Sequence, residues 1–202
     1  MIRRFYIVVT GKVPKMSLSP IKQEILETML LNEKPQRAME IAKETKKEFP
    51  QVMMHLLGLV RMGYVNTPVK GIYIITQKGK EAIGIPETNK EKAAVILAYT
   101  PHDKAFEFYS DIGHPLHLHA HSLRDFVNKI EKANINSIEF HTKRDDFEAW
   151  FKGLGDVELA KKTVVLKKRN LAGEDLRKQL HELVQQRYVA LAKLADQPVY
   201  NE

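Results

Sequence analysis

VMMHLLGLVRMGYV, residues 52–65, carries the clearest structural pattern in the first part of the chain. Its apolar side chains recur at the three- and four-residue spacing of one helix face, at Val52, Leu56, Leu59 and Val60. This spacing predicts a helix over residues 50–62. Gly63 is expected to end the helix, since glycine readily takes the left-handed conformation found just beyond many helix ends.

Residues 64–76, which follow this helix, contain two apolar runs of strand length separated by Lys70-Gly71. They predict two strands joined by a tight turn, and residues 76–84 predict a short closing helix.

Two further helices are predicted upstream. Ser19-Pro20 combines a capping serine with a proline suited to the first turn, and it begins a helix that ends near Asn32. The apolar face of this helix consists of Ile21, Ile25, Leu26, Met29 and Leu30. Residues 36–46 predict a shorter helix with a face of alanine and isoleucine.

This order of elements over residues 17–83 resembles prokaryotic winged helix-turn-helix regulators. The matching positions at the end of the third helix and the start of the wing are Leu56, Leu59, Gly63, Tyr64 and Val65. ITQKGKEAI, residues 75–83, is similar to the segment that closes such domains. The resemblance implies a DNA-binding protein whose third helix enters the major groove, while the wing and helix ends contact phosphates.

The face that the third helix would present to DNA is unusual. Its exposed positions by helical periodicity are Gln51, Met54, Leu57, Gly58 and Arg61, with Met53 at the margin. Base edges offer hydrogen-bond donors and acceptors, which Met54 and Leu57 cannot match. Two interpretations stay open: the helix contacts DNA mainly through its ends and flanking lysines, or its face packs against another protein.

Basic residues flank this helix at positions suited to phosphate contact. They are Lys12, Lys15, Lys43, Lys46, Lys47, Arg61 and Lys70. Such contacts make binding salt-dependent and only modestly sequence-selective. The predicted DNA-binding residues are Lys46, Lys47, Gln51, Met54, Arg61 and Lys70. Ordinary solvated charges, or another nucleic acid as the ligand, are the alternatives.

The net charge of +7 lies entirely in the first part of the chain. Residues 1–90 contain 15 Lys and Arg against 8 Asp and Glu, whereas residues 91–202 contain 17 of each. A polyanionic partner is therefore expected for the first part only.

The chain of 202 residues has no cysteine, which excludes disulfides, thiolate zinc sites and cysteine nucleophiles. No apolar run reaches the ~20 residues of a membrane span, and the N-terminus lacks the features of a signal peptide. We therefore expect a cytoplasmic protein that makes no membrane contact.

The length allows two small domains. We predict a winged helix-turn-helix domain over residues 1–88, including an extra strand at residues 5–9, and a second domain over residues 89–202. The second domain is expected to be mainly helical with a small antiparallel sheet, with a helix or a strand at residues 90–100. The predicted fold class is α+β.

Four of the eight histidines fall in HPLHLHAHS, residues 114–122. After a turn at residues 113–115, strict alternation places His117, His119 and His121 on one strand face and the leucines on the inward face. Three imidazoles suit a metal ion, but neighbours on a strand face lie ~6.5–7 Å apart and converge poorly. A half-exposed strand is the favoured interpretation; metal binding and catalysis remain alternatives, and no cofactor is predicted.

Four later segments resemble an uncharacterised family of prokaryotic domains with no established activity. They are HSLRDF (121–126), SIEFH (137–141), RDDFEAW (144–150) and LGDVELA (154–160). Within them Ser122 and Asp156 are predicted to cap helices, as is Asp145 or Asp146.

His141, Asp145 and Trp150 suggest a catalytic group, but packing of His141 and Trp150 in the core is favoured. The chain lacks G-x-S-x-G, H-E-x-x-H, P-loop and G-x-G-x-x-G motifs, so we predict that it is not an enzyme.

Residues 173–196 predict one long helix with an apolar stripe at Leu176, Leu180, Leu183, Val184, Leu191 and Leu194. The stripe suits either its own domain or a second copy of the chain. Because regulators that bind duplex DNA are often two-fold dimers, a homodimer is expected.

The predicted function is a transcriptional regulator that binds double-stranded DNA and uses its second domain to dimerise or to sense a signal. A protein-interaction module is the alternative, and a metal-dependent enzyme is a more distant one.

Overall fold

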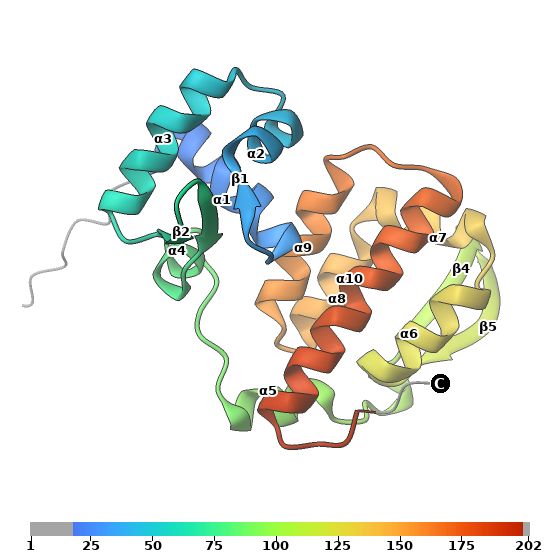
Figure 1. Ribbon diagram of the computed structural model, residues 1–202. Helices are drawn as coiled ribbons and strands as arrows, with labels where there is room; N and C mark the ends of the chain where they lie inside the picture. The colour runs from blue at the N-terminus through green and yellow to red at the C-terminus, as the bar shows by residue number, and fades with distance from the viewer. Residues whose placement is uncertain (1–17, 200–202) are drawn as a thin grey trace, which may run out of the picture.

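Residues 18–199 are described by a computed structural model, which is mainly helical and has two small antiparallel sheets (Figure 1). The predicted α+β class is confirmed. The predicted strand at residues 5–9, and with it Lys12 and Lys15, lies outside the described residues.

The N-terminal region, residues 18–86, contains the elements predicted for it and one more. They are α1 (Pro20–Asn32), β1 (Gln36–Arg37), α2 (Ala38–Thr45), α3 (Phe49–Arg61), β2 (Val65–Val69), β3 (Ile72–Ile75) and α4 (Gln77–Ala82). The strands form an antiparallel sheet in the order β1-β3-β2, with Gln36 opposite Tyr73. β1 was not predicted, because two residues carry no periodic signal.

The C-terminal region, residues 87–199, is mainly helical. Its elements are α5 (Lys90–Leu97), a 3-10 turn η1 (His102–Lys104), β4 (Phe106–Asp111), β5 (His114–Ala120), α6 (Leu123–Lys132), α7 (Ile135–Arg144), α8 (Asp146–Gly153), α9 (Val157–Lys167) and α10 (Gly173–Leu194). Residues 90–97 are thus a helix. As predicted, Ser122 and Asp156 cap α6 and α9 through their side chains. Neither Asp145 nor Asp146 caps α8 in this way, because both carboxylates bind basic side chains.

The long helix α10 crosses the C-terminal region and contacts α5, α6, α7 and α9 (Figure 1). Its apolar stripe is buried within the chain, at Leu176, Leu180, Leu183, Val184 and Leu191. Leu194 was wrongly assigned to the stripe, since it is 41% exposed. The stripe therefore covers its own chain and does not supply a surface for a second copy.

The hairpin of β4 and β5 departs from the predicted alternation. The chain turns at residues 112–113, one position earlier than predicted, so that His114 already lies in β5. Pairing passes from Glu107 opposite His119 to Tyr109 opposite Pro115, which places more residues on β5 than on β4. Within this irregular stretch His117 has a left-handed φ of 52°, and the strict alternation fails there.

Two clusters of buried apolar side chains form the core. The N-terminal cluster extends from Ile25 to Ile85, and the C-terminal cluster extends from Ala93 to Leu191 and also includes Leu31 at the end of α1. The predicted division between residues 88 and 89 falls between the clusters and stays a prediction. No helix within residues 18–199 is both long enough and apolar enough to cross a bilayer.

The two regions meet where α1 and Lys80 of α4 lie beside α9, through charged side chains that are buried except for the exposed Glu33 and the half-buried Lys80. We call these residues the buried charge network: Glu33, Lys80, Asp156, Glu158, Lys162 and Arg187. Arg187 on α10 lies 2.9 Å from Asp156 and 3.2 Å from Glu158. Glu158 also binds Lys162 at 2.9 Å and Lys80 at 3.3 Å, and both lysines bind Glu33 after α1.

More ion pairs join the same surfaces outside this network. Glu27 on α1 is 2.8 Å from both Lys161 and Lys168, and Glu44 on α2 is 2.8 Å from Arg169. Glu27, Glu33 and Glu44 of the N-terminal region therefore face basic side chains of α9 and of the residues that follow it.

Replacing Arg187 by Met should lower the free energy of unfolding by about 3–5 kcal/mol, because it leaves the fully buried Asp156 carboxylate unpaired. Urea denaturation measures the loss. Lys90→Gln, which breaks an exposed ion pair with Asp196, is the control and should leave the midpoint in place. Equal midpoints for the two variants would contradict the role given to Arg187.

The carboxylates at the junction predict a pH dependence. Burial alone would raise the pKa of Glu158, but the charges of Lys162, Arg187 and Lys80 outweigh it and lower this pKa to about 2. Burial is similarly outweighed at Glu27, where hydrogen bonds from Gln23, Lys161 and Lys168 lower the pKa to about 2. A lowered folded-state pKa contributes stability above the ordinary value near 4.5, and that contribution is lost as the pH falls toward 2.

The free energy of unfolding should therefore decrease as the pH is lowered from 5 to about 2.5. Urea titrations at several pH values measure this slope, which should be shallower in Glu27→Gln than in the exposed control Glu87→Gln. A stability that does not change with pH over this interval would show that the junction carboxylates are not stabilised as ions.

Candidate nucleic-acid interface

The exposed face of α3 is set by the helix's own packing. Val52, Leu56 and Leu59 are fully buried against the N-terminal cluster. The opposite face is exposed at Gln51, Met54, Leu57 and Arg61, as predicted, whereas Gly58 and Met53 are half-buried. Met54 and Leu57 are 61% and 46% exposed, so two apolar side chains occupy the centre of this face.

The end of α3 fixes where the hairpin of β2 and β3 begins, and this hairpin is called the wing below. Gly63 has a φ of 73°, and its N–H donates to the Val60 carbonyl at 2.9 Å, as the predicted helix stop requires. Thr76, just after β3, donates its hydroxyl to the Gly63 carbonyl at 2.8 Å. A Cβ on Gly79 would lie 2.2 Å from the Tyr64 carbonyl, so only glycine allows α4 to approach the wing this closely.

The predicted basic residues fall into two places. Arg61 ends α3 and Lys70 lies at the wing tip, and neither forms an ion pair within residues 18–199. Lys46 ends α2 and borders a groove between α1, α2 and α9, while Lys47 is 3.2 Å from Glu24 on α1. Arg61 and Lys70 therefore belong with the exposed face of α3, and Lys46 and Lys47 lie toward its back.

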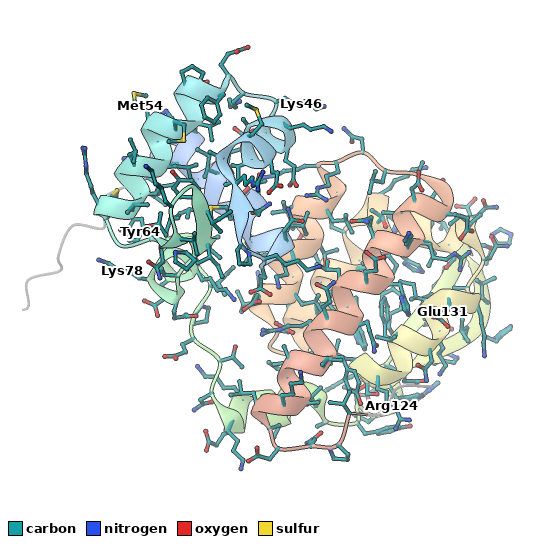
Figure 2. All side chains as sticks on the ribbon, viewed as in Figure 1. Lys46, Met54, Tyr64, Lys78, Arg124 and Glu131 are labelled. Carbon is teal, nitrogen blue, oxygen red and sulfur yellow. The ribbon has the colours of Figure 1, made fainter. Side chains whose placement is uncertain are left out.

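Two lysines beside α3 were not predicted. Lys78 donates to the Met62 carbonyl at 3.0 Å and lies 5.5 Å from the centre of the Tyr64 ring. Figure 2 shows Met54, Tyr64 and Lys78 on the side of the N-terminal region that faces away from the C-terminal region. Lys22 on α1 reaches the Met62 sulfur at 3.7 Å and covers Gly58. Lys22 and Lys78 lie beside α3 because α1 and α4 pack on it, and the sequence alone does not show this packing.

A feature of composition marks this surface. Residues 49–80, which contain α3, the wing and the first residues of α4, include no Asp or Glu. They do include Arg61, Lys70, Lys78 and Lys80, of which Lys80 points into the buried charge network. The outward charge of this segment is therefore positive throughout.

The histidines form a different group from the predicted one. The His102 ring lies 4.8 Å from that of His119 and 6.0 Å from that of His121, while the exposed Tyr99 stacks on His121 at 4.8 Å. His117 is exposed and lies in the irregular part of β5. Over the part of the chain that is described, no set of three or more His, Asp or Glu side chains is arranged to hold a metal ion.

His141 has both ring nitrogens engaged. Its Nδ1 lies 2.8 Å from Asp146 Oδ2, and its Nε2 accepts the Tyr109 N–H at 2.8 Å. Asp145 instead binds Lys167, and the Trp150 indole N–H donates to the Lys104 carbonyl. His141 therefore joins α7, α8 and β4 and has no free lone pair for proton transfer.

One of three comparisons with known proteins gives a match. A family model described as "Family of unknown function (DUF5752)" matches residues 80–185. The matched range includes all four segments from HSLRDF to LGDVELA. No curated protein and no solved structure matches the chain.

Burial lowers the pKa of His141 and outweighs the opposing effect of Asp146. The imidazole should therefore be more than half neutral at pH 6.5, and the proton of the neutral ring should lie on Nδ1, which nitrogen-15 NMR of the ring reports directly. Exposed His114 is the internal comparison. A protonated His141 ring at that pH, or a proton on Nε2, would contradict the hydrogen bonds described here.

Proposed function

Because the chain belongs to a family of unknown function (DUF5752), we propose its function from the structure: it binds double-stranded DNA through the exposed face of α3, the wing and Lys78. The observation that carries the proposal is the acid-free segment 49–80, whose outward charges are all positive. Phosphates repel carboxylates and attract lysines and arginines, so this surface suits a duplex backbone.

The arrangement of elements supports the same proposal. α2 and α3 follow each other through a short turn, and α3 is followed by an antiparallel hairpin that pairs with β1. In winged helix-turn-helix proteins the helix in this position enters the major groove. Here it lies on the outer side of the molecule, away from α9 and α10, so a duplex meets no obstruction from the C-terminal region (Figure 1).

The side chains of α3 favour backbone contact over base recognition. Gln51 and Arg61 are the exposed polar side chains that suit base edges, whereas Met54 and Leu57 suit only apolar groups such as a thymine methyl. Binding should therefore depend strongly on salt and weakly on sequence. We expect such a protein to be a transcriptional regulator that works in the cytoplasm as a homodimer. Two copies that each recognise DNA weakly can together recognise a longer site more specifically.

A second candidate function rests on the apolar centre of the same face. Phe49, Met54 and Leu57 are 41%, 61% and 46% exposed on one helix, and exposed large apolar side chains that cluster often mark a protein interface. A protein partner would bury Met54 and Leu57 and would be indifferent to Lys70 and Lys78. The two functions therefore depend on different residues of one surface.

The test is fluorescence anisotropy of a labelled random duplex with the full chain, at several salt concentrations. The triple variant Arg61→Gln, Lys70→Gln, Lys78→Gln should weaken binding and reduce the slope of log K against log salt by about 2–3, since each lost phosphate contact removes roughly 0.9.

The matched control changes three exposed lysines of the C-terminal region, Lys152, Lys178 and Lys193, to Gln. This control changes the net charge by the same amount as the first triple variant. Its slope of log K against log salt should equal that of the unchanged protein. The same loss in both triple variants, or no binding to the duplex at low salt, would refute DNA binding through α3. Met54→Gln with Leu57→Gln should leave the salt slope intact and would abolish binding to a protein partner.

A further inference from the structure

The middle of the exposed face of α3 is a small, contiguous apolar surface. Residues three and four positions apart are neighbours on a helix, so Met54 lies beside Leu57 and Gly58. Met54 and Leu57 are 61% and 46% exposed, and Gly58 contributes no side chain. Met54 lies on the side that faces away from the C-terminal region (Figure 2). We call these three residues the α3 apolar site.

Basic side chains border this apolar site. Arg61 lies one turn after Leu57 on the same helix. The Lys22 side chain from α1 lies beside Gly58, with its Cε 3.5 Å from the position that a Cβ there would occupy. No Asp or Glu occurs in α3, in the wing or in the first residues of α4. A ligand that reaches the apolar site therefore also meets positive charge.

This combination fits a duplex better than a protein. The buried cores of protein interfaces are depleted of lysine, and a stable interface buries about 1,200–2,000 Å² in total, far more than two side chains supply. A duplex instead places base edges in the major groove and phosphates on both of its sides. Lysines and arginines beside α3 then meet phosphates, and the apolar site meets base edges.

The base edges differ in what they offer to an apolar side chain. In the major groove guanine, adenine and cytosine present hydrogen-bond donors or acceptors, whereas thymine also presents a C5-methyl group. A donor or acceptor that loses its water against Met54 or Leu57 stays unsatisfied, which costs free energy. A methyl group has no such requirement, and its burial is favourable. 5-Methylcytosine carries the same group at the same ring position.

We propose that the α3 apolar site recognises pyrimidine C5-methyl groups in the major groove, an inference that rests on the proposed binding of double-stranded DNA. An α-helix rises about 4.5 Å from residue 54 to residue 57, which is close to the roughly 3.4 Å between stacked bases. Met54 and Leu57 therefore reach methyl groups on neighbouring base pairs. Phosphate contacts supply most of the affinity, and the methyl contacts add a modest preference among sequences.

The test compares labelled duplexes of one sequence that differ only in C5-methyl groups, by fluorescence anisotropy with the full chain at one salt concentration. The first duplex contains thymine, and the second contains deoxyuridine in place of every thymidine. The third is the second duplex with 5-methylcytosine in place of every cytosine. Each methyl group buried should tighten binding by about fourfold, the factor for one methylene group removed from water. Tighter binding of the first or the third duplex than of the second supports the proposal and identifies the base that carries the methyl group.

Two double variants assign the preference to α3. Met54→Gln with Leu57→Gln removes both apolar side chains and should make the affinities for the methylated and unmethylated duplexes equal. Val95→Gln with Leu194→Gln changes two exposed apolar side chains of the C-terminal region in the same way and should keep the preference. A preference that survives in the first double variant would come from the shape of the methylated duplex and would overturn the proposal.

Two further outcomes separate this inference from the proposed function. Equal affinities of the unchanged protein for all three duplexes would overturn methyl recognition but leave DNA binding in place, and would favour a protein partner for Met54 and Leu57. No binding to any of the duplexes would refute DNA binding through α3, and the inference with it.

Discussion

The contact between Arg187 and Asp156 is the interaction on which the arrangement of the molecule depends. Asp156 is fully buried, caps α9 through the Leu159 N–H, and holds Arg187 of α10 through two oxygens. Arg187 also reaches Glu158, which binds Lys80 of α4. One chain of charges thus fixes α9, α10 and the N-terminal region together. Buried ion pairs add little net stability over apolar packing, but breaking one is costly, so their main effect is to select one arrangement.

The ion pairs between the two regions, inside and outside this network, also explain why one surface is positive. Glu27, Glu33 and Glu44 all lie on the side of the N-terminal region that meets α9, where they bind lysines and an arginine of the C-terminal region. Ion pairs at the junction therefore neutralise the negative charge of these three side chains. On the outer surface α3 and the wing carry no acidic residue, so Arg61, Lys70 and Lys78 leave that surface positive. Charge separation across the N-terminal region is thus a consequence of how the two regions are joined.

Local features of the fold were predictable from the sequence, and distant pairings were not. Periodicity gave the bounds of α1 and α3 to within a residue or two, and Gly63 ends α3 as expected. Nothing local indicates that Lys162 meets Glu33, because 129 positions separate them. The alternation around His117 failed because an antiparallel pair can hold extra residues on one strand. For the candidate interface, periodicity identified the exposed face of α3, but Lys78 joined it only through the packing of α4.

The same network limits how the N-terminal region can move relative to α9 and α10. Lys80 and Lys162 hold Glu33, at the end of α1, beside α9, so rotation of the whole N-terminal region would break these pairs. α2 takes no part in the network, is joined to the C-terminal region through Glu44 and Arg169, and leads directly into α3. Movements of α3 that leave the network intact should therefore arise in α2 and the turn at residues 46–48, because the network holds the end of α1 in place.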